Sequence, residues 1–118
     1  MKGYILLWKD KNSNEVHFDS YAKCENGTLA DTLKKQKISL TKLLGGKDIV
    51  RTYRTWTHHG CGGYVTHWFF DYKNYDKVVA NIKSYDYKVL LNVREYYDSE
   101  LKCNVIKSLE TGEELLRY

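Results

Sequence analysis

Two β-rich segments joined by a glycine-rich stretch constrain the fold of this chain more than any other feature. Residues 49–57 and 64–72 are dominated by β-branched and aromatic side chains, which favour strands. The residues that join them are His58-His59-Gly60-Cys61-Gly62-Gly63. Two such runs with a glycine-containing loop between them are typical of a β-hairpin. We therefore predict a long hairpin over residues 49–72 with a glycine-rich tip.

The segments on either side extend this β-rich pattern. Residues 3–9 form a short apolar run and residues 15–21 alternate apolar and polar side chains, so the chain is expected to open with another hairpin. After the central hairpin, apolar residues recur at helical spacing over residues 75–85. Turn residues then separate three further predicted strands, at 87–97, 101–109 and 113–118.

A helical segment lies between the two hairpins. Thr28 and Asp31 have the spacing of a capping box, in which side chains satisfy the free backbone donors at a helix start. Four leucines then fall on one face of a single helix: Leu29, Leu33, Leu40 and Leu44. The alternative is a kink around Lys37, with Ser39 capping a second, shorter helix.

Together these segments predict an α+β fold in which a mostly antiparallel β-sheet of about seven strands, in the order ββαββαβββ, carries two amphipathic helices. A length of 118 residues fits one compact domain spanning residues 1–118. No apolar run near the N-terminus is long enough for a signal peptide or a membrane span. The three widely spaced cysteines do not resemble a disulfide framework. We therefore expect a cytoplasmic protein with free thiols and no membrane partner.

Positive charge is concentrated in the middle of the chain. Residues 34–54 carry seven basic side chains and one acidic one, although the whole chain has a net charge of only +4. Alternation along the predicted strand pairs a guanidinium with an aromatic ring on each face, which suits phosphate and base or an acidic protein surface. Solvated lysines and core aromatics are the purely structural alternative. The predicted partner-binding residues are Lys34, Lys35, Lys37, Lys42, Arg51, Tyr53, Arg54, Trp56, His58 and His59.

One short stretch holds side chains suited to catalysis or metal binding. A structural zinc site commonly uses two close pairs of ligands, and this stretch offers one pair. A Cys61 nucleophile with His58 or His59 as its base has no evident third group to orient it. The metal-ligand candidates are His58, His59, Cys61 and His67. Because a glycine-rich turn with polar tip residues explains the same pattern, we expect no catalytic residue, no metal and no cofactor.

The sequence contains no phosphate-binding loop, dinucleotide-binding glycine motif, zinc-protease motif or serine-hydrolase motif, which argues against most enzymes. Its small size, richness in Lys and Tyr and lack of Pro resemble accessory proteins of bacteriophages and mobile elements, although this resemblance covers no motif. The leading hypothesis is a non-enzymatic binding protein that occupies another macromolecule's functional surface. Its most concrete form is an anti-CRISPR-like counter-defence inhibitor that binds an acidic protein surface of a nucleic-acid-handling complex. The alternatives are a module that binds single-stranded nucleic acid or a nucleotide, and a Cys61/His-dependent enzyme or zinc protein.

Overall fold

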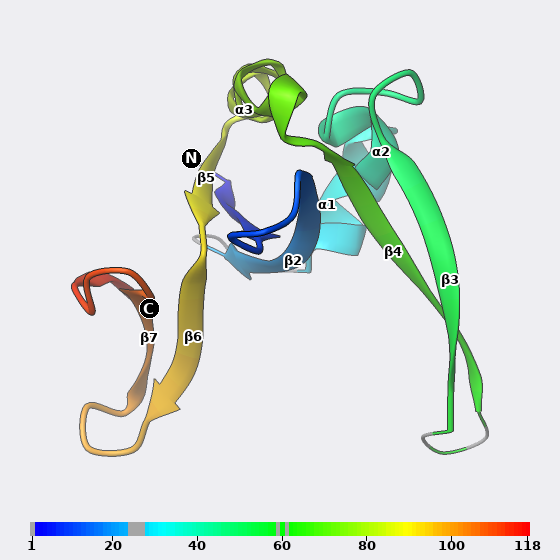
Figure 1. The fold of residues 1–118 in the computed structure, drawn as a ribbon. Coiled ribbons are helices and arrows are strands. Elements are labelled where there is room, and N and C mark those ends of the chain that lie inside the picture. The colour runs from blue at the N-terminus through cyan, green and yellow to red at the C-terminus, as the bar shows by residue number, and fades with distance from the viewer. Residues whose placement is uncertain (1, 24–27, 59, 61) are drawn as a thin grey trace.

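A computed structural model describes residues 2–23, 28–58, 60 and 62–118 of the chain (Figure 1). Within these residues, the first sheet has the strand order β3-β4-β2-β1-β5 and the second has the order β6-β7-β8. The strands are β1 (Gly3–Lys9), β2 (Glu15–Lys23), β3 (Arg51–Thr57), β4 (Gly63–Asp71), β5 (Tyr87–Leu91), β6 (Val93–Asp98), β7 (Cys103–Ser108) and β8 (Glu114–Arg117). The helices are α1 (Leu29–Gln36), α2 (Leu40–Leu43), the short 3-10 helix η1 (Tyr72–Asn74) and α3 (Tyr75–Ser84). The predicted α+β class is confirmed.

Helices α1 and α2 are separate, so the kinked alternative is correct and the single continuous helix is wrong. The Thr28 hydroxyl accepts a hydrogen bond from the Asp31 amide at 3.1 Å and begins α1. Lys37 then adopts a left-handed conformation with φ of 56°, and its amide donates to carbonyls of the preceding turn. Ser39 restarts the helix by accepting from the Lys42 amide at 3.1 Å.

The predicted strand over residues 87–97 is two strands that belong to different sheets. Asn92 separates β5 from β6 with a positive φ of 53°, a conformation that asparagine tolerates better than most residues. Its side-chain amide accepts from the Lys9 amide at 2.8 Å and donates to the Lys9 carbonyl at 2.9 Å. The described residues therefore contain eight strands, where about seven were expected, and β5 runs parallel to β1.

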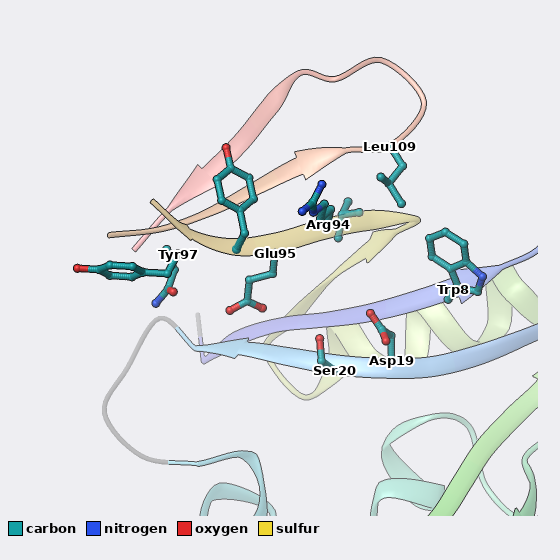
Figure 2. A pocket seen from close by; sticks show the side chains of 10 residues that line it. Trp8, Asp19, Ser20, Arg94, Glu95, Tyr97 and Leu109 are labelled. Atoms are coloured by element: carbon teal, nitrogen blue, oxygen red, sulfur yellow. The ribbon is translucent and has the colours of Figure 1, made fainter. Parts of the chain in front are cut away.

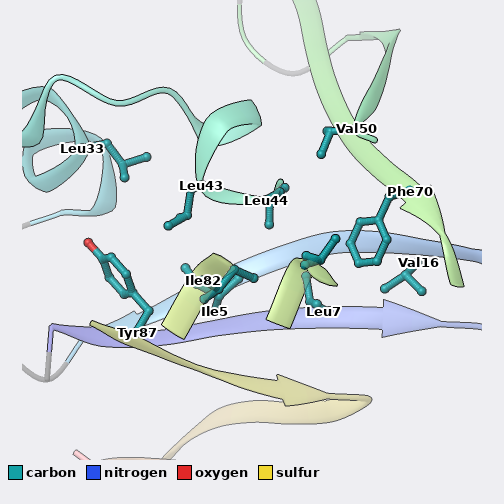
Figure 3. Packing of buried hydrophobic residues seen from close by; sticks show 11 residues of the cluster. Ile5, Leu7, Val16, Leu33, Leu43, Leu44, Val50, Phe70, Ile82 and Tyr87 are labelled. Atoms are coloured by element: carbon teal, nitrogen blue, oxygen red, sulfur yellow. The ribbon is translucent and has the colours of Figure 1, made fainter. Parts of the chain in front are cut away.

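Alternation along β1 places apolar side chains on both faces of the first sheet. Ile5 and Leu7 point to the side covered by the helices, where they pack with Leu43, Leu44 and other buried residues (Figure 3). Leu6 points to the opposite side and packs beneath the second sheet. The buried residues around Leu6 are Ala22, Val93 and Ile106. Each fully buried aliphatic side chain stabilises the fold by about 1.5–3 kcal/mol. The two clusters therefore keep the helices packed on one face of the first sheet and the second sheet packed on the other.

The β3–β4 hairpin extends out of this core. Its base is fixed by the buried Val50 and Phe70 and by Trp68, whose indole N–H donates to the Thr41 hydroxyl at 3.2 Å. Strand β4 pairs with β2 only between residues 69 and 71 of β4. Beyond that contact, β3 and β4 continue as a two-stranded ribbon that extends past the helices (Figure 1). No helix in the described part of the chain is long and apolar enough to cross a membrane.

Candidate binding site on the projecting hairpin

The two strands of the hairpin present two different faces. Trp56 lies opposite Tyr64 in the antiparallel register, and Tyr53 lies opposite His67. Because side chains alternate along a strand and opposite residues share a face, the register defines two surfaces. The Arg54 face consists of Arg54, Trp56 and Tyr64. The Tyr53 face consists of Tyr53, Thr55, Val65 and His67.

The Arg54 face continues the helix-covered side of the sheet into solvent. The Arg54 guanidinium lies 4.8 Å from the centre of the Tyr64 ring, and the Trp56 and Tyr64 rings meet edge to face at 5.0 Å. The Trp56 indole N–H also donates to His58 Nδ1 at 3.3 Å. Tyr64 remains 62% exposed and Trp56 remains 53% exposed, so these contacts orient the rings without covering them. A cation and two ring surfaces are therefore presented together to a partner.

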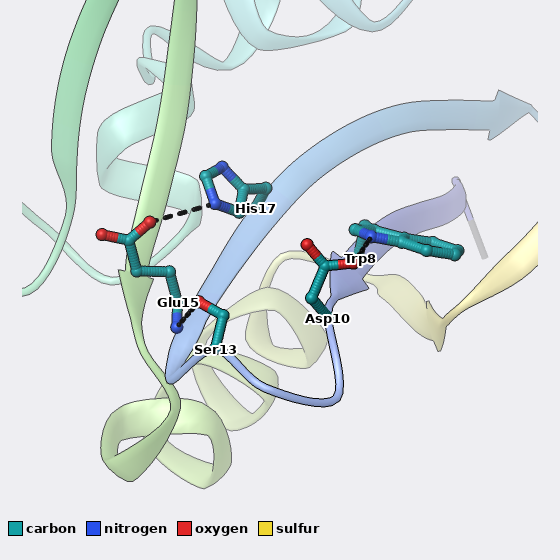
Figure 4. A network of polar contacts seen from close by, with 5 residues as sticks. All are labelled: Trp8, Asp10, Ser13, Glu15 and His17. Carbon is teal, nitrogen blue, oxygen red and sulfur yellow. Dashed lines mark hydrogen bonds and ion pairs between the residues drawn. The ribbon is translucent and has the colours of Figure 1, made fainter.

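The Tyr53 face carries a second ring cluster. Tyr53 stacks on His67 at 4.6 Å between ring centres, and the Thr55 hydroxyl shares a 2.8 Å hydrogen bond with His67 Nε2. The cluster continues along β4 to Phe69, whose ring stacks with that of His17 in β2 at 5.6 Å between ring centres. His17 Nε2 in turn lies 3.3 Å from a Glu15 carboxylate oxygen (Figure 4). On this face, stacked rings and hydrogen bonds connect the ribbon to β2 in the body of the sheet.

The charge of the hairpin is entirely positive. Residues 49–70 contain Arg51 and Arg54 but no Asp or Glu, although Arg51 lines a concavity at the hairpin base together with Glu15, Asp48 and Asp71. Both arginines are exposed. Within the described residues neither guanidinium forms an ion pair, and Arg54 does not line the acidic concavity beside Arg51, so the charge of Arg54 is available to attract an acidic surface.

The predicted lysines lie away from the ribbon, on the helical segments. Lys34 and Lys35 belong to the last turn of α1, Lys37 is its C-cap, and Lys42 is in α2. All four are exposed. The helices lie on the same side of the sheet as the Arg54 face. Trp68 shows this, since it shares that face of β4 and its indole N–H donates to Thr41 of α2. The predicted partner-binding set is therefore distributed over the ribbon and the neighbouring helices.

The candidate metal and catalytic residues are only partly placed. His59 and Cys61 lie outside the described residues. His58 bonds to Trp56 on the Arg54 face, whereas His67 stacks on Tyr53 on the opposite face. Among the described residues, no three His, Cys, Asp or Glu side chains are grouped so that they could hold a metal ion.

Two features were missed by reasoning from sequence. Tyr64 completes the Arg54 face, and only the hairpin register shows that it lies opposite Trp56. A concavity of about 660 Å³ between the two sheets is also absent from any local pattern (Figure 2). Residues of both sheets line it, including Trp8, Asp19, Ser20, Arg94, Glu95 and Tyr97.

No protein-family model, curated protein or solved structure shows significant similarity to this chain.

Proposed function

We propose that this chain is a binding protein that lays its β3–β4 ribbon against an acidic surface of another macromolecule and so occupies that surface. The observation that carries the proposal is the Arg54 face, where a guanidinium and two exposed rings stand together outside the hydrophobic core. Arg, Tyr and Trp are the residue types that contribute most to protein interfaces when they become desolvated. A partner would desolvate all three side chains at once.

The most concrete form of this proposal is a counter-defence inhibitor of a nucleic-acid-cutting complex, in the manner of an anti-CRISPR protein. Enzymes that cut nucleic acids commonly hold divalent cations with carboxylates, and such carboxylate clusters are acidic hollows. A ribbon without acidic residues over 49–70 complements a surface of this kind. Strands β3 and β4 extend beyond the helices and can therefore enter a recessed site (Figure 1).

Direct binding of single-stranded nucleic acid is the second candidate. The observation that favours it is the exposure of Trp56 beside Arg54, because a base stacks on a ring while a guanidinium neutralises phosphate. Such binding weakens steeply with salt, with a log-log slope of about −0.7 for each phosphate neutralised on a single strand. A contact dominated by shape and apolar burial has a shallower slope.

Two assays on the same protein preparation test the proposal. The first measures binding to labelled single- and double-stranded DNA and RNA across a salt series. The second measures cleavage of target DNA by a panel of purified RNA-guided nucleases in the presence of increasing amounts of the protein. We expect no measurable nucleic-acid binding at moderate salt and inhibition of at least one nuclease. Tight, salt-sensitive nucleic-acid binding without inhibition would establish the second candidate instead.

The matched variants are Arg54→Glu in the ribbon and Arg94→Glu in β6. Both arginines are exposed and both lie over a tyrosine ring, at 4.8 Å from Tyr64 and 5.7 Å from Tyr96 respectively. We expect Arg54→Glu to weaken inhibition and Arg94→Glu to preserve it. Equal inhibition by the two variants would show that the charge of the ribbon does not contribute to inhibition.

A further inference from the structure

No strand among the described residues pairs with the outer edge of β3. Strand β3 is the terminal strand of the five-stranded sheet and pairs with β4 along residues 51–57 without a register shift. In an antiparallel ladder, alternate residues direct their backbone N–H and C=O groups away from the partner strand. Residues 51–56 are all exposed, so this row of polar groups faces solvent in the described structure.

Within the described residues, the β3 edge has little protection against strand addition beyond two positive charges. Sheet edges are commonly blocked by proline, charged side chains, a bulge or a covering element. Residues 51–57 contain no proline, their pairing with β4 is regular, and their only charges are those of Arg51 and Arg54, which repel a basic strand and attract an acidic one. An edge of this length and regularity can accept another extended strand and form a further ladder.

We propose that β3 binds an extended, acidic segment of a partner protein by strand addition. This inference rests on the proposed function and specifies the partner as a polypeptide strand, because a nucleic acid has no peptide groups to complete a ladder. The β3 edge is preferred to the free part of the β4 edge because both arginines of the ribbon belong to β3. A second copy of this chain is a poor occupant because its own β3 would bring two more arginines and no carboxylate.

The side chains of β3 define the pattern that the added strand should carry. Arg51 and Arg54 are three residues apart and therefore lie on opposite faces, so a matching strand has acidic residues three apart. Tyr53 and Trp56 have the same spacing and favour apolar neighbours. An antiparallel strand of sequence Val-Thr-Glu-Val-Thr-Glu places Glu beside each arginine and Val beside each ring.

The experiment uses a synthetic, end-capped peptide with this sequence and the intact protein. Backbone amide signals of the protein are followed by NMR during titration, and amide hydrogen exchange is measured at saturation. We expect alternate amides between residues 51 and 56 to gain at least tenfold protection from exchange. The amides of β7, which lies between two strands of the other sheet, serve as the internal control and should not change.

Two peptides that are N-methylated at adjacent residues separate edge pairing from contact with a face. Only one of two neighbouring amides points toward β3, so methylation there should weaken binding about tenfold or more, whereas methylation of its neighbour should be tolerated. Equal binding of both methylated peptides, or no added protection in β3, would overturn the strand-addition proposal. A stable dimer of the free protein that protects the same β3 amides would also overturn it.

These outcomes remain distinct from failure of the proposed function. If strand addition fails but Arg54→Glu still weakens nuclease inhibition, the ribbon binds its partner through a face. If Arg54→Glu leaves inhibition intact, the proposed function itself is wrong.

Discussion

The guanidinium of Arg54 lies 4.8 Å from the centre of the Tyr64 ring, across the two strands of the ribbon. Exposed cation–π pairs of this kind contribute about 0.5–1 kcal/mol to stability. We therefore expect Arg54→Ala to lower the free energy of unfolding by no more than about 1 kcal/mol, and Arg94→Ala, which removes the corresponding contact with Tyr96, to behave alike. Urea denaturation measures both. A much larger loss for Arg54→Ala would make this side chain a structural element of the hairpin.

Tyr64 and Tyr97 form a matched pair for testing the exposed rings. They are 62% and 63% exposed, but Tyr64 belongs to the ribbon and Tyr97 to β6. We expect Tyr64→Ala to weaken partner binding about tenfold or more, as truncation of a central interface aromatic does. Tyr97→Ala should change binding less than about twofold. The inhibitory concentration in the nuclease assay compares the two variants, and equal losses would place the interface elsewhere.

Gly62 fixes the approach of the hairpin turn to Trp56. Its φ is +76°, and a Cβ there would lie 2.8 Å from Trp56 Cζ2. We expect Gly62→Ala to displace the indole and weaken partner binding while the free energy of unfolding falls by about 1–2 kcal/mol at most. Gly60→Ala is the control, because its φ is also positive but a Cβ at Gly60 would meet no atom within 4 Å. If both variants bind equally well, the orientation of Trp56 does not matter.

The side chain of Asn92 fixes the junction between β5 and β6 to the end of β1. Asn92→Ala removes both hydrogen bonds to the Lys9 backbone and places a less tolerant residue at positive φ. We expect a loss of about 1–3 kcal/mol, because the Lys9 groups are left unpaired. Asn92→Gly restores the backbone freedom and should recover only part of that loss. Guanidinium denaturation of the three proteins measures the difference, and full recovery by glycine would show that the hydrogen bonds contribute nothing.

Tyr118 makes the free energy of unfolding depend on pH in the alkaline range. Burial and its hydrogen bond to Glu95 raise the pKa of the Tyr118 hydroxyl above the usual tyrosine value of about 10. The folded state therefore favours the protonated phenol, so this contribution is complete below pH of about 10 and is lost as the pH rises through the pKa of the folded protein. We expect Tyr118→Phe to reduce the fall in unfolding free energy between about pH 9 and 11.5.

The exposed Tyr97→Phe is the comparison for this alkaline titration. Identical pH dependence in the wild type and Tyr118→Phe would show that the Tyr118 hydroxyl is not coupled to folding.

Local sequence patterns predicted most of the elements and the composition of the ribbon. Alternation alone assigned Arg54 and Trp56 to one face, because the side-chain period of a strand is two residues. Capping by Thr28 and Ser39 located the two helix starts, since each hydroxyl bonds to an amide only three residues away. Contacts of this kind are encoded within a few residues.

Relationships between distant segments could not be read in the same way. The break at Asn92 is hidden within a continuous run of strand-forming residues, and it depends on Lys9, which is 83 positions away in sequence. The partnership of Arg54 with Tyr64 depends on the register of β3 against β4. The concavity between the sheets exists only after β6 has packed near β2, so no local pattern contains it (Figure 2).

Charge reversal in the ribbon tests the proposed function most directly. The variant is Arg51→Glu with Arg54→Glu, and its control is Arg94→Glu with Lys107→Glu, two cations that both lie over the Tyr96 ring. The measurement is the inhibitory concentration against a nuclease that the wild type inhibits, with folding of each variant verified by circular dichroism. We expect the ribbon variant to lose at least tenfold in potency and the control to stay within twofold of the wild type. Full potency in a folded ribbon variant would contradict the proposal that β3 and β4 occupy an acidic surface.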